Sequence, residues 1–203
     1  MQLPPPETSF RKKVRAGRYT IRKLIRFKRQ ELANELKDIN AALKADGRNW
    51  EDKEDDTIDA YADRDAVDDT LDASTQDIRV ELAGRGRKAS TEAPYTDVFH
   101  SGVGHYTEAT LDLEVERYME LVQNISTALP EDDPIRVQKL PVIEAAIDDY
   151  KRADEAVTKA EIEVTMARLA LKKTEASWAR VMEKIYGLLI AEIGLKAADR
   201  FFR

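Results

Sequence analysis

The sequence predicts an all-α protein: an elongated helical bundle of two antiparallel helical hairpins, with one very long C-terminal helix that resembles a coiled-coil strand. Three observations predict this class. Of the 203 residues 35% are charged, and only eight are glycine and seven proline. Apolar residues recur every three or four positions along most of the chain, which is the spacing of one helix face. The longest such stripe runs from Tyr150 to Leu195, about six heptads.

The first predicted hairpin covers residues 10–83. Residues 1–9, which include three consecutive prolines, precede it as a disordered or extended tail. A turn at 46–49 is expected to join its two helices, because Gly47 suits the left-handed position that ends many helices. The second helix then runs over residues 50–82, and the short turn brings residue i of the first helix close to about residue 95 − i of the second.

The second predicted hairpin covers residues 107–203. Between the two hairpins lies the one predicted linker, residues 84–106, which contain four glycines and no apolar period and form the only candidate domain boundary. A third helix is expected over 107–129, followed by a proline-bounded turn at 130–134. The last helix then runs from about 141 to about 196.

The third helix is too short to cover the whole apolar seam of the last helix. Its N-terminal end lies opposite about residue 157, and the seam continues beyond that point. Large apolar side chains on this seam need a cover, since burying each one contributes about 1.5–3 kcal/mol. The first hairpin or a second copy of the chain would supply it. The residues predicted to bind a partner here are Val164, Leu171, Trp178, Val181, Ile185 and Leu188.

The net charge of −6 conceals a strong asymmetry along the chain. Residues 1–30 hold ten basic residues and one acidic residue, whereas residues 51–77 hold twelve acidic and two basic residues. With the predicted register, part of the basic segment faces acids, and the rest leaves one end of the hairpin basic. The residues predicted to bind an anion or an acidic partner are Arg11, Lys12, Lys13, Arg15, Arg18, Arg85, Arg87 and Lys88.

A basic end of this kind attracts nucleic acid, an anionic membrane or an acidic protein surface. The net acidity of the whole chain argues against a dedicated nucleic-acid binder, because such domains are usually basic overall. The same polarity suits head-to-tail self-assembly, in which the basic end of one copy meets the acidic segment of another.

Catalytic chemistry finds little support in this sequence. The chain has no cysteine, which excludes disulfides, thiolate zinc sites and a cysteine nucleophile. Its only histidines, His100 and His105, fall in the predicted linker, and no third ligand has the spacing of a metal site. Phosphate-binding loops, zinc-protease motifs and hydrolase motifs are absent. We therefore expect no enzyme, no cofactor, no metal and no small-molecule substrate.

The sequence thus favours a non-catalytic structural or protein-interaction protein. It would self-assemble as a homo-oligomer, or dock into a larger complex, through its helical seams and oppositely charged ends. The alternative is a binding module for nucleic acid or an anionic membrane, acting through the basic N-terminal segment. A cytoplasmic location is expected, because the N-terminus lacks the pattern of a signal peptide and no stretch of about 20 apolar residues is present.

Overall fold

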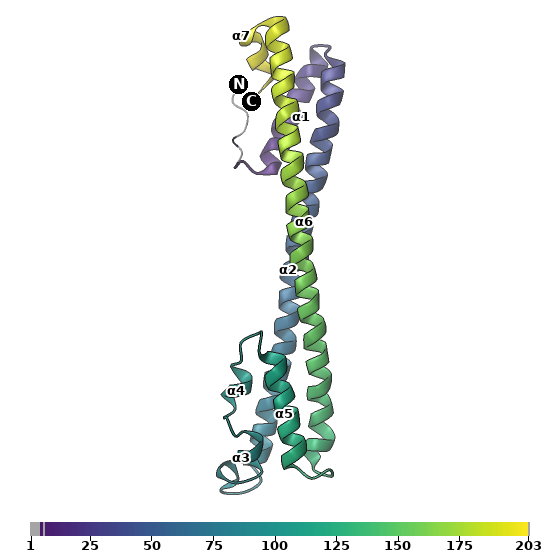
Figure 1. Cartoon of the computed structure of the whole chain (residues 1–203). Coiled ribbons are helices and arrows are strands. Elements are labelled where there is room, and N and C mark those ends of the chain that lie inside the picture. The colour runs from purple at the N-terminus through teal and green to yellow at the C-terminus, as the bar shows by residue number, and fades with distance from the viewer. Residues whose placement is uncertain (1–4, 6, 203) are drawn as a thin grey trace. The chain divides into compact units, whose positions relative to one another are not determined.

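The computed structural model describes residue 5 and residues 7–202, and it confirms the all-α class: these residues contain no strand. Of the tail predicted for residues 1–9, residues 1–4 and 6 lie outside this description. The helices, shown in Figure 1, are α1 (Phe10–Arg26), α2 (Gln30–Ala83), α3 (Tyr95–Val98), α4 (Gly104–Thr107), α5 (Glu114–Ala128), α6 (Leu140–Ile193) and α7 (Leu195–Ala198), with the 3-10 turns η1 (Ala89–Thr91) and η3 (Asp199–Phe201) and the π-helical turn η2 (Ile135–Lys139).

The chain divides into two compact units. Unit 1 consists of Met1–Thr57 and Ala160–Arg203, and unit 2 consists of Ile58–Lys159. The long helices α2 and α6 contribute residues to both units. The boundary between the units therefore lies inside α2 and α6. Glycine and proline, which mark domain boundaries in a sequence, do not mark a boundary inside a helix.

Residues 84–106 are not a linker between domains, which corrects the sequence prediction. The whole segment belongs to unit 2, and its side chains Val98, Phe99 and Tyr106 are buried there. The Tyr106 hydroxyl donates a hydrogen bond to the Val98 carbonyl oxygen, at 3.2 Å. The segment lacks an apolar period because its buried residues come from short turns rather than from one helix.

The first hairpin turns at residues 27–29 and not at 46–49, so the predicted register is wrong. Helix α2 runs without a break through Gly47. Lys28 instead adopts a φ of 59°, in the left-handed region, and ends α1. This position carries no glycine or proline, and those are the residues by which turns are recognised in a sequence.

Two glycines allow close packing between helices in unit 1. A Cβ atom on Gly17 would lie 2.8 Å from Cγ of Asn40 in α2 and 3.0 Å from Nε1 of Trp178 in α6. A Cβ atom on Gly47 would lie 2.6 Å from Cγ of Phe10 in α1. Both distances are shorter than van der Waals contact, so each glycine is required by the approach of a neighbouring helix.

The core of unit 1 is formed by α1, the first part of α2 and the last part of α6. At its centre, Trp178 is 1% exposed, and its Nε1 donates a hydrogen bond to Asn40 Oδ1 at 3.1 Å. This hydrogen bond satisfies the indole N–H of Trp178 and the amide oxygen of Asn40. The chain's own N-terminal helices therefore cover the distal part of α6.

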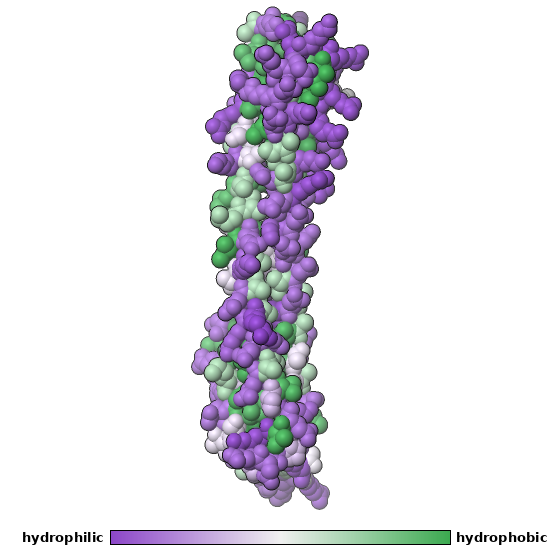
Figure 2. Space-filling model, turned by 90° about the vertical axis from the view of Figure 1, so that its right-hand side faces the viewer, coloured by the Kyte–Doolittle hydropathy of each residue, from purple (hydrophilic) through white to green (hydrophobic). Residues whose placement is uncertain are grey.

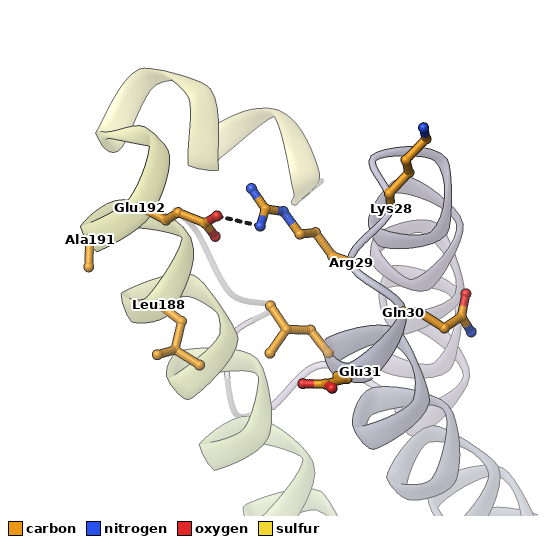
Figure 3. A pocket seen from close by; sticks show the side chains of 8 residues that line it. Lys28, Arg29, Gln30, Glu31, Leu188, Ala191 and Glu192 are labelled. Atoms are coloured by element: carbon orange, nitrogen blue, oxygen red, sulfur yellow. Dashed lines mark ion pairs between the residues drawn. The ribbon is translucent and has the colours of Figure 1, made fainter.

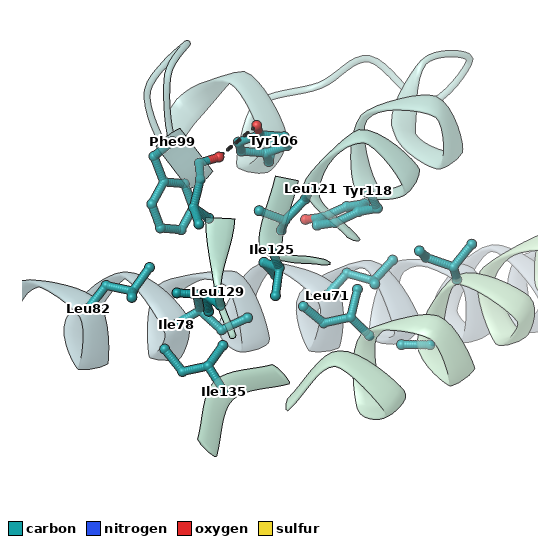
Figure 4. Packing of buried hydrophobic residues seen from close by; sticks show 14 of the residues in the cluster. Leu71, Ile78, Leu82, Phe99, Tyr106, Tyr118, Leu121, Ile125, Leu129 and Ile135 are labelled. Atoms are coloured by element: carbon teal, nitrogen blue, oxygen red, sulfur yellow. Dashed lines mark hydrogen bonds between the residues drawn. The ribbon is translucent and has the colours of Figure 1, made fainter. Parts of the chain in front are cut away.

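The core of unit 2 is formed by the last part of α2, α5 and the first part of α6, together with residues of the 84–106 segment (Figure 4). Helix α5 begins at Glu114, later than the predicted 107, because residues 104–107 form the separate helix α4. The largest fully buried side chains of this core are Leu71, Ile78, Leu82, Tyr106, Tyr118, Leu121, Ile125 and Tyr150.

Replacing Gly17 with alanine tests the close approach of α1. We expect Gly17→Ala to lower the free energy of unfolding by about 1–3 kcal/mol, because the added methyl group overlaps Asn40 and displaces its bond to Trp178. Gly187→Ala is the matched control, since a Cβ at Gly187 in α6 meets no atom within 4 Å. It should raise stability by about 0.5–1 kcal/mol through helix propensity. Urea denaturation followed by circular dichroism measures both, and equal stability of Gly17→Ala and the wild type would contradict the packing described above.

Candidate anion-binding groove

Helix α1 has a strongly basic composition and two different faces. It contains eight basic residues and no acidic residue. Phe10, Val14 and Leu24 face the core of unit 1. Burying a cation without a partner is costly, and most of the basic side chains of α1 are exposed.

A groove of about 430 Å³ lies between α1 and α2 in unit 1. Its lining combines three kinds of side chain. The basic ones are Arg18, Arg22, Lys37 and Lys44. The apolar ones are Val14, Ile21, Ile25, Ala33 and Ala41, and the amides are Gln30, Asn34 and Asn40. No carboxylate lines the groove, so four positive charges stand beside an apolar floor.

These four cations are not neutralised by nearby acids. Among the described residues, neither Arg18 nor Arg22 on α1 forms an ion pair, and the same holds for Lys37 and Lys44 on α2. Guanidinium groups remain charged at all physiological pH values, and lysine ammonium groups do so unless they are buried. The groove is therefore a region of uncompensated positive charge, which attracts anionic ligands.

Among the predicted anion-binding residues of α1, only Arg18 lines this groove. Arg11 forms a double hydrogen bond with the carboxylate of Glu51, at 2.8 and 2.7 Å. Lys13 is only 5% exposed, and its Nζ lies 2.8 Å from Glu175 Oε1. The remaining two, Lys12 and Arg15, are exposed outside the groove.

Arg85, Arg87 and Lys88 belong to unit 2, whereas the other predicted anion-binding residues belong to unit 1. Arg85 makes a bidentate contact with the carboxylate of Asp133, at 2.7 Å for each hydrogen bond, and this contact lowers the pKa of Asp133. The other two are exposed. The predicted grouping rests on a hairpin turn at 46–49, and the turn at 27–29 gives α1 other neighbours. Anion binding by these residues stays a prediction.

Sequence reasoning missed three of the four groove cations: Arg22, Lys37 and Lys44. The sequence contains a signal for two of them, because Lys37 and Lys44 lie seven residues apart and therefore on one helix face. Joining that face to α1 requires the register of the α1–α2 hairpin, which the sequence reading placed elsewhere.

The predicted partner-binding seam of α6 is divided between buried and exposed positions. Leu171, Trp178 and Ile185 are buried in the core of unit 1. Val164 and Val181 are half-buried, and Leu188 is 46% exposed. The first three have no surface left for a partner, so any docking surface of this protein must use other residues.

The seam shifts by one residue toward the end of α6. Met182 and Leu189 are buried, at 1% and 0% exposure, whereas the sequence pattern placed Val181 and Leu188 there. A heptad pattern repeats every 3.5 residues, and a straight helix repeats every 3.6, so the buried face drifts along a long helix.

Leu188 borders a second hollow in unit 1, of about 700 Å³, where the α1–α2 turn faces the end of α6 (Figure 3). Its charges are mixed. Arg29 forms an ion pair with Glu192, and the lining also includes one further cation, Lys28, and one further carboxylate, Glu31. This hollow is larger than the α1–α2 groove but offers no excess of either charge, so it gives no preference for an anionic ligand.

The two histidines meet at one carboxylate in unit 2. His100 Nε2 lies 3.4 Å from Glu120 Oε1, and His105 Nε2 lies 3.1 Å from Glu120 Oε2. Hydrogen bonding to His105, together with Arg117, lowers the pKa of Glu120. In the described part of the chain no group of three or more histidine, aspartate or glutamate residues is arranged to hold a metal ion. The contacts hold the segment before α5 against that helix.

A cluster of acids, of which Glu114 is buried and Asp68 and Asp72 are half-buried, lies at the start of α5. Glu114 is 3% exposed and shares a hydrogen bond with Asp68 of α2. The Tyr118 hydroxyl donates to Asp72 Oδ1 at 2.6 Å. Burial, followed by the hydrogen bond to Asp68 and the charges of Asp68 and Asp72, raises the pKa of Glu114 to about 8. Glu114 is therefore protonated near neutral pH, which avoids a buried negative charge beside the carboxylate of Asp68.

Glu114 should make the stability of the protein fall with rising pH. Its pKa is about 8 in the folded protein against an ordinary 4.5, so the unfolded chain loses this proton first, and the free energy of unfolding decreases between these two values. We expect Glu114→Gln to reduce this slope, with stability near that of the wild type at pH 4 and above it at pH 8. Urea denaturation across this range measures the slope. The exposed Glu116→Gln is the control, and a wild-type slope in Glu114→Gln would contradict the assignment.

Comparison with known proteins adds no relative: no protein-family model, curated protein or solved structure matches this chain. Among the described residues, no helix has both the length and the apolar character needed to cross a membrane. Figure 2 shows one face of the protein, on which hydrophilic residues surround smaller apolar patches.

Proposed function

We propose that this protein is a non-catalytic interaction protein that docks onto an acidic amphipathic helix through the α1–α2 groove of unit 1. The observation that carries the proposal is the lining of the groove. Four cations without ion pairs stand around an apolar floor that contains Ile21 and Ile25, and no carboxylate takes part. Ile25 is 48% exposed, so this floor offers apolar area for a partner to cover.

The dimensions of the groove suit a helix. The lining residues of α1 extend from Val14 to Ile25, a rise of about 16 Å at 1.5 Å per residue, or about three helical turns. A groove between two adjacent helices accepts a third helix, whose apolar side chains enter the groove while its polar side chains meet the rims. Cations on both rims select a helix with carboxylates on either side of its apolar stripe.

Nucleic acid and anionic membranes fit this groove less well. Binding of single-stranded nucleic acid commonly uses aromatic side chains for stacking, and none lines the groove. The net charge of −6 on the whole chain also disfavours binding of a polyanion. A module for nucleic acid or anionic membrane remains the second candidate, since phosphates bind the same cations. The cytoplasmic location predicted from the sequence stays a prediction.

A labelled peptide tests the proposal. The probe is a helical peptide with isoleucine and alanine on one face and aspartate on both flanks, and its binding is measured by fluorescence anisotropy. We expect it to bind the wild type, and Arg22→Glu/Lys37→Glu to weaken binding about tenfold or more, because each reversal replaces an attraction of up to ~1 kcal/mol with a repulsion.

The matched control is Lys12→Glu/Arg15→Glu, which changes the net charge equally through exposed residues outside the groove. It should leave peptide affinity within about threefold of the wild type, since distant surface charges are screened by salt. Equal losses in both double variants would contradict a groove-specific site. Binding of single-stranded DNA or of vesicles containing phosphatidylserine, without binding of the peptide, would replace the proposal with the second candidate.

A further inference from the structure

We propose that the acidic helix for this groove is a segment of α2 in a second copy of the chain, residues 58–69 of unit 2, so that copies join head to tail. The inference rests on the proposed function and names its partner. It follows from an independent observation, the composition of one exposed face of α2.

This face has an apolar centre. Ile58 is 64% exposed, and Ala62 and Ala66 are exposed at the next two turns of the same face. Residues four apart lie one above the other on a helix. An isoleucine left almost two-thirds exposed on an otherwise charged helix loses its burial energy unless another surface covers it.

Carboxylates lie on this face and beside it, because Asp65 and Asp69 follow Ile58 and Ala62 by seven residues, whereas Asp59 and Asp63 come one position further round the helix. Asp59, Asp63, Asp65 and Asp69 are all exposed. The one basic residue of the segment, Arg64, is only 9% exposed and lies 3.4 Å from Asp154 on α6 and 3.6 Å from Asp65.

Among the described residues, Asp59, Asp63 and Asp69 form no ion pair. Carboxylates four residues apart, such as Asp59 and Asp63, repel one another and destabilise an isolated helix. A cationic groove from outside the unit would relieve this repulsion.

The acidic face and the groove have the same length, opposite charges and exposed apolar side chains. Residues 58–69 rise about 16 Å, the same as the α1 side of the groove. The face presents four aspartates and the groove four cations, and both have apolar centres. Of the acidic helices the groove could accept, this one is always present at the concentration of the protein itself.

The contact joins two different surfaces, so it is a heterologous interface. Each copy carries one groove and one acidic face, so a copy that is bound through one of them keeps the other free, and assembly continues into a ring or an open chain. A symmetric dimer, in which both copies use the same surface, is not expected.

Charge exchange in the full chain tests this contact. Sedimentation velocity at low ionic strength should show that the wild type associates as its concentration rises. Arg22→Glu/Lys37→Glu should abolish association, and so should Asp59→Lys/Asp63→Lys. The variant with all four substitutions should associate again, because the two glutamates of its groove then meet the two lysines of its face, while Arg18 and Lys44 still meet Asp65 and Asp69. The control Asp112→Lys/Glu116→Lys matches the charge change of the face variant at exposed residues outside this face, and it should associate like the wild type.

The outcomes separate this inference from the proposed function. A wild type that stays monomeric, a fourfold variant that fails to associate, or a control that also loses association would each overturn the head-to-tail contact. If the acidic peptide described above still binds the wild-type groove, the proposed function survives and only the identity of the partner fails. Asp59→Lys/Asp63→Lys keeps its groove, so it should still bind that peptide, which shows that the variant is folded.

Discussion

The close packing of α1 against α2 and α6 is the constraint on which the rest of unit 1 depends. Gly17 and Gly47 remove the side chains that would hold the helices apart. The resulting proximity lets Trp178 reach Asn40, and it buries the distal seam of α6 within the chain. The groove also follows from it, because its two walls are the faces of α1 and α2 that stay exposed once this packing is complete.

Charge distribution in unit 1 is a consequence of that packing. Helix α1 supplies eight cations, and a buried charge is tolerated only with a partner. Lys13 is buried because Glu175 pairs with it, and Arg11 is fixed by Glu51. Arg18 and Arg22 have no such acid, so they remain beside Lys37 and Lys44 as a positively charged rim. In unit 2 the crowded charges are negative, and protonation of the buried Glu114 reduces the repulsion between it and Asp68 and Asp72.

Sequence reasoning succeeds here where the signal is periodic and fails where it is a single residue. The all-α class and the long helix α6 follow from repeated apolar spacing, and both are present. The turn at Lys28 was missed because a lysine adopts a conformation usually marked by glycine. Gly47 was misread for the opposite reason, since it serves a helix contact rather than a turn.

That single error in the turn also explains why the site was only partly predicted. Arg18 was identified, but its neighbours Lys37 and Lys44 come from a helix that the predicted register placed against other residues. The one-residue shift from Leu188 to Leu189 in α6 is smaller and has a different cause, the drift of a straight helix relative to a heptad pattern. The composition of the chain shows neither the register of α1 against α2 nor the drift of the buried face along α6.

The most direct test of the account is a cross-link between copies of the unmodified protein. A carbodiimide joins a lysine amine to a carboxylate only where the two are in contact, and an equal mixture of ¹⁴N- and ¹⁵N-labelled chains distinguishes links between copies from links within one. We expect mixed-isotope peptides that join Lys37 or Lys44 to an aspartate of residues 58–69. Links confined to one isotope, or mixed links that join other surfaces, would contradict it.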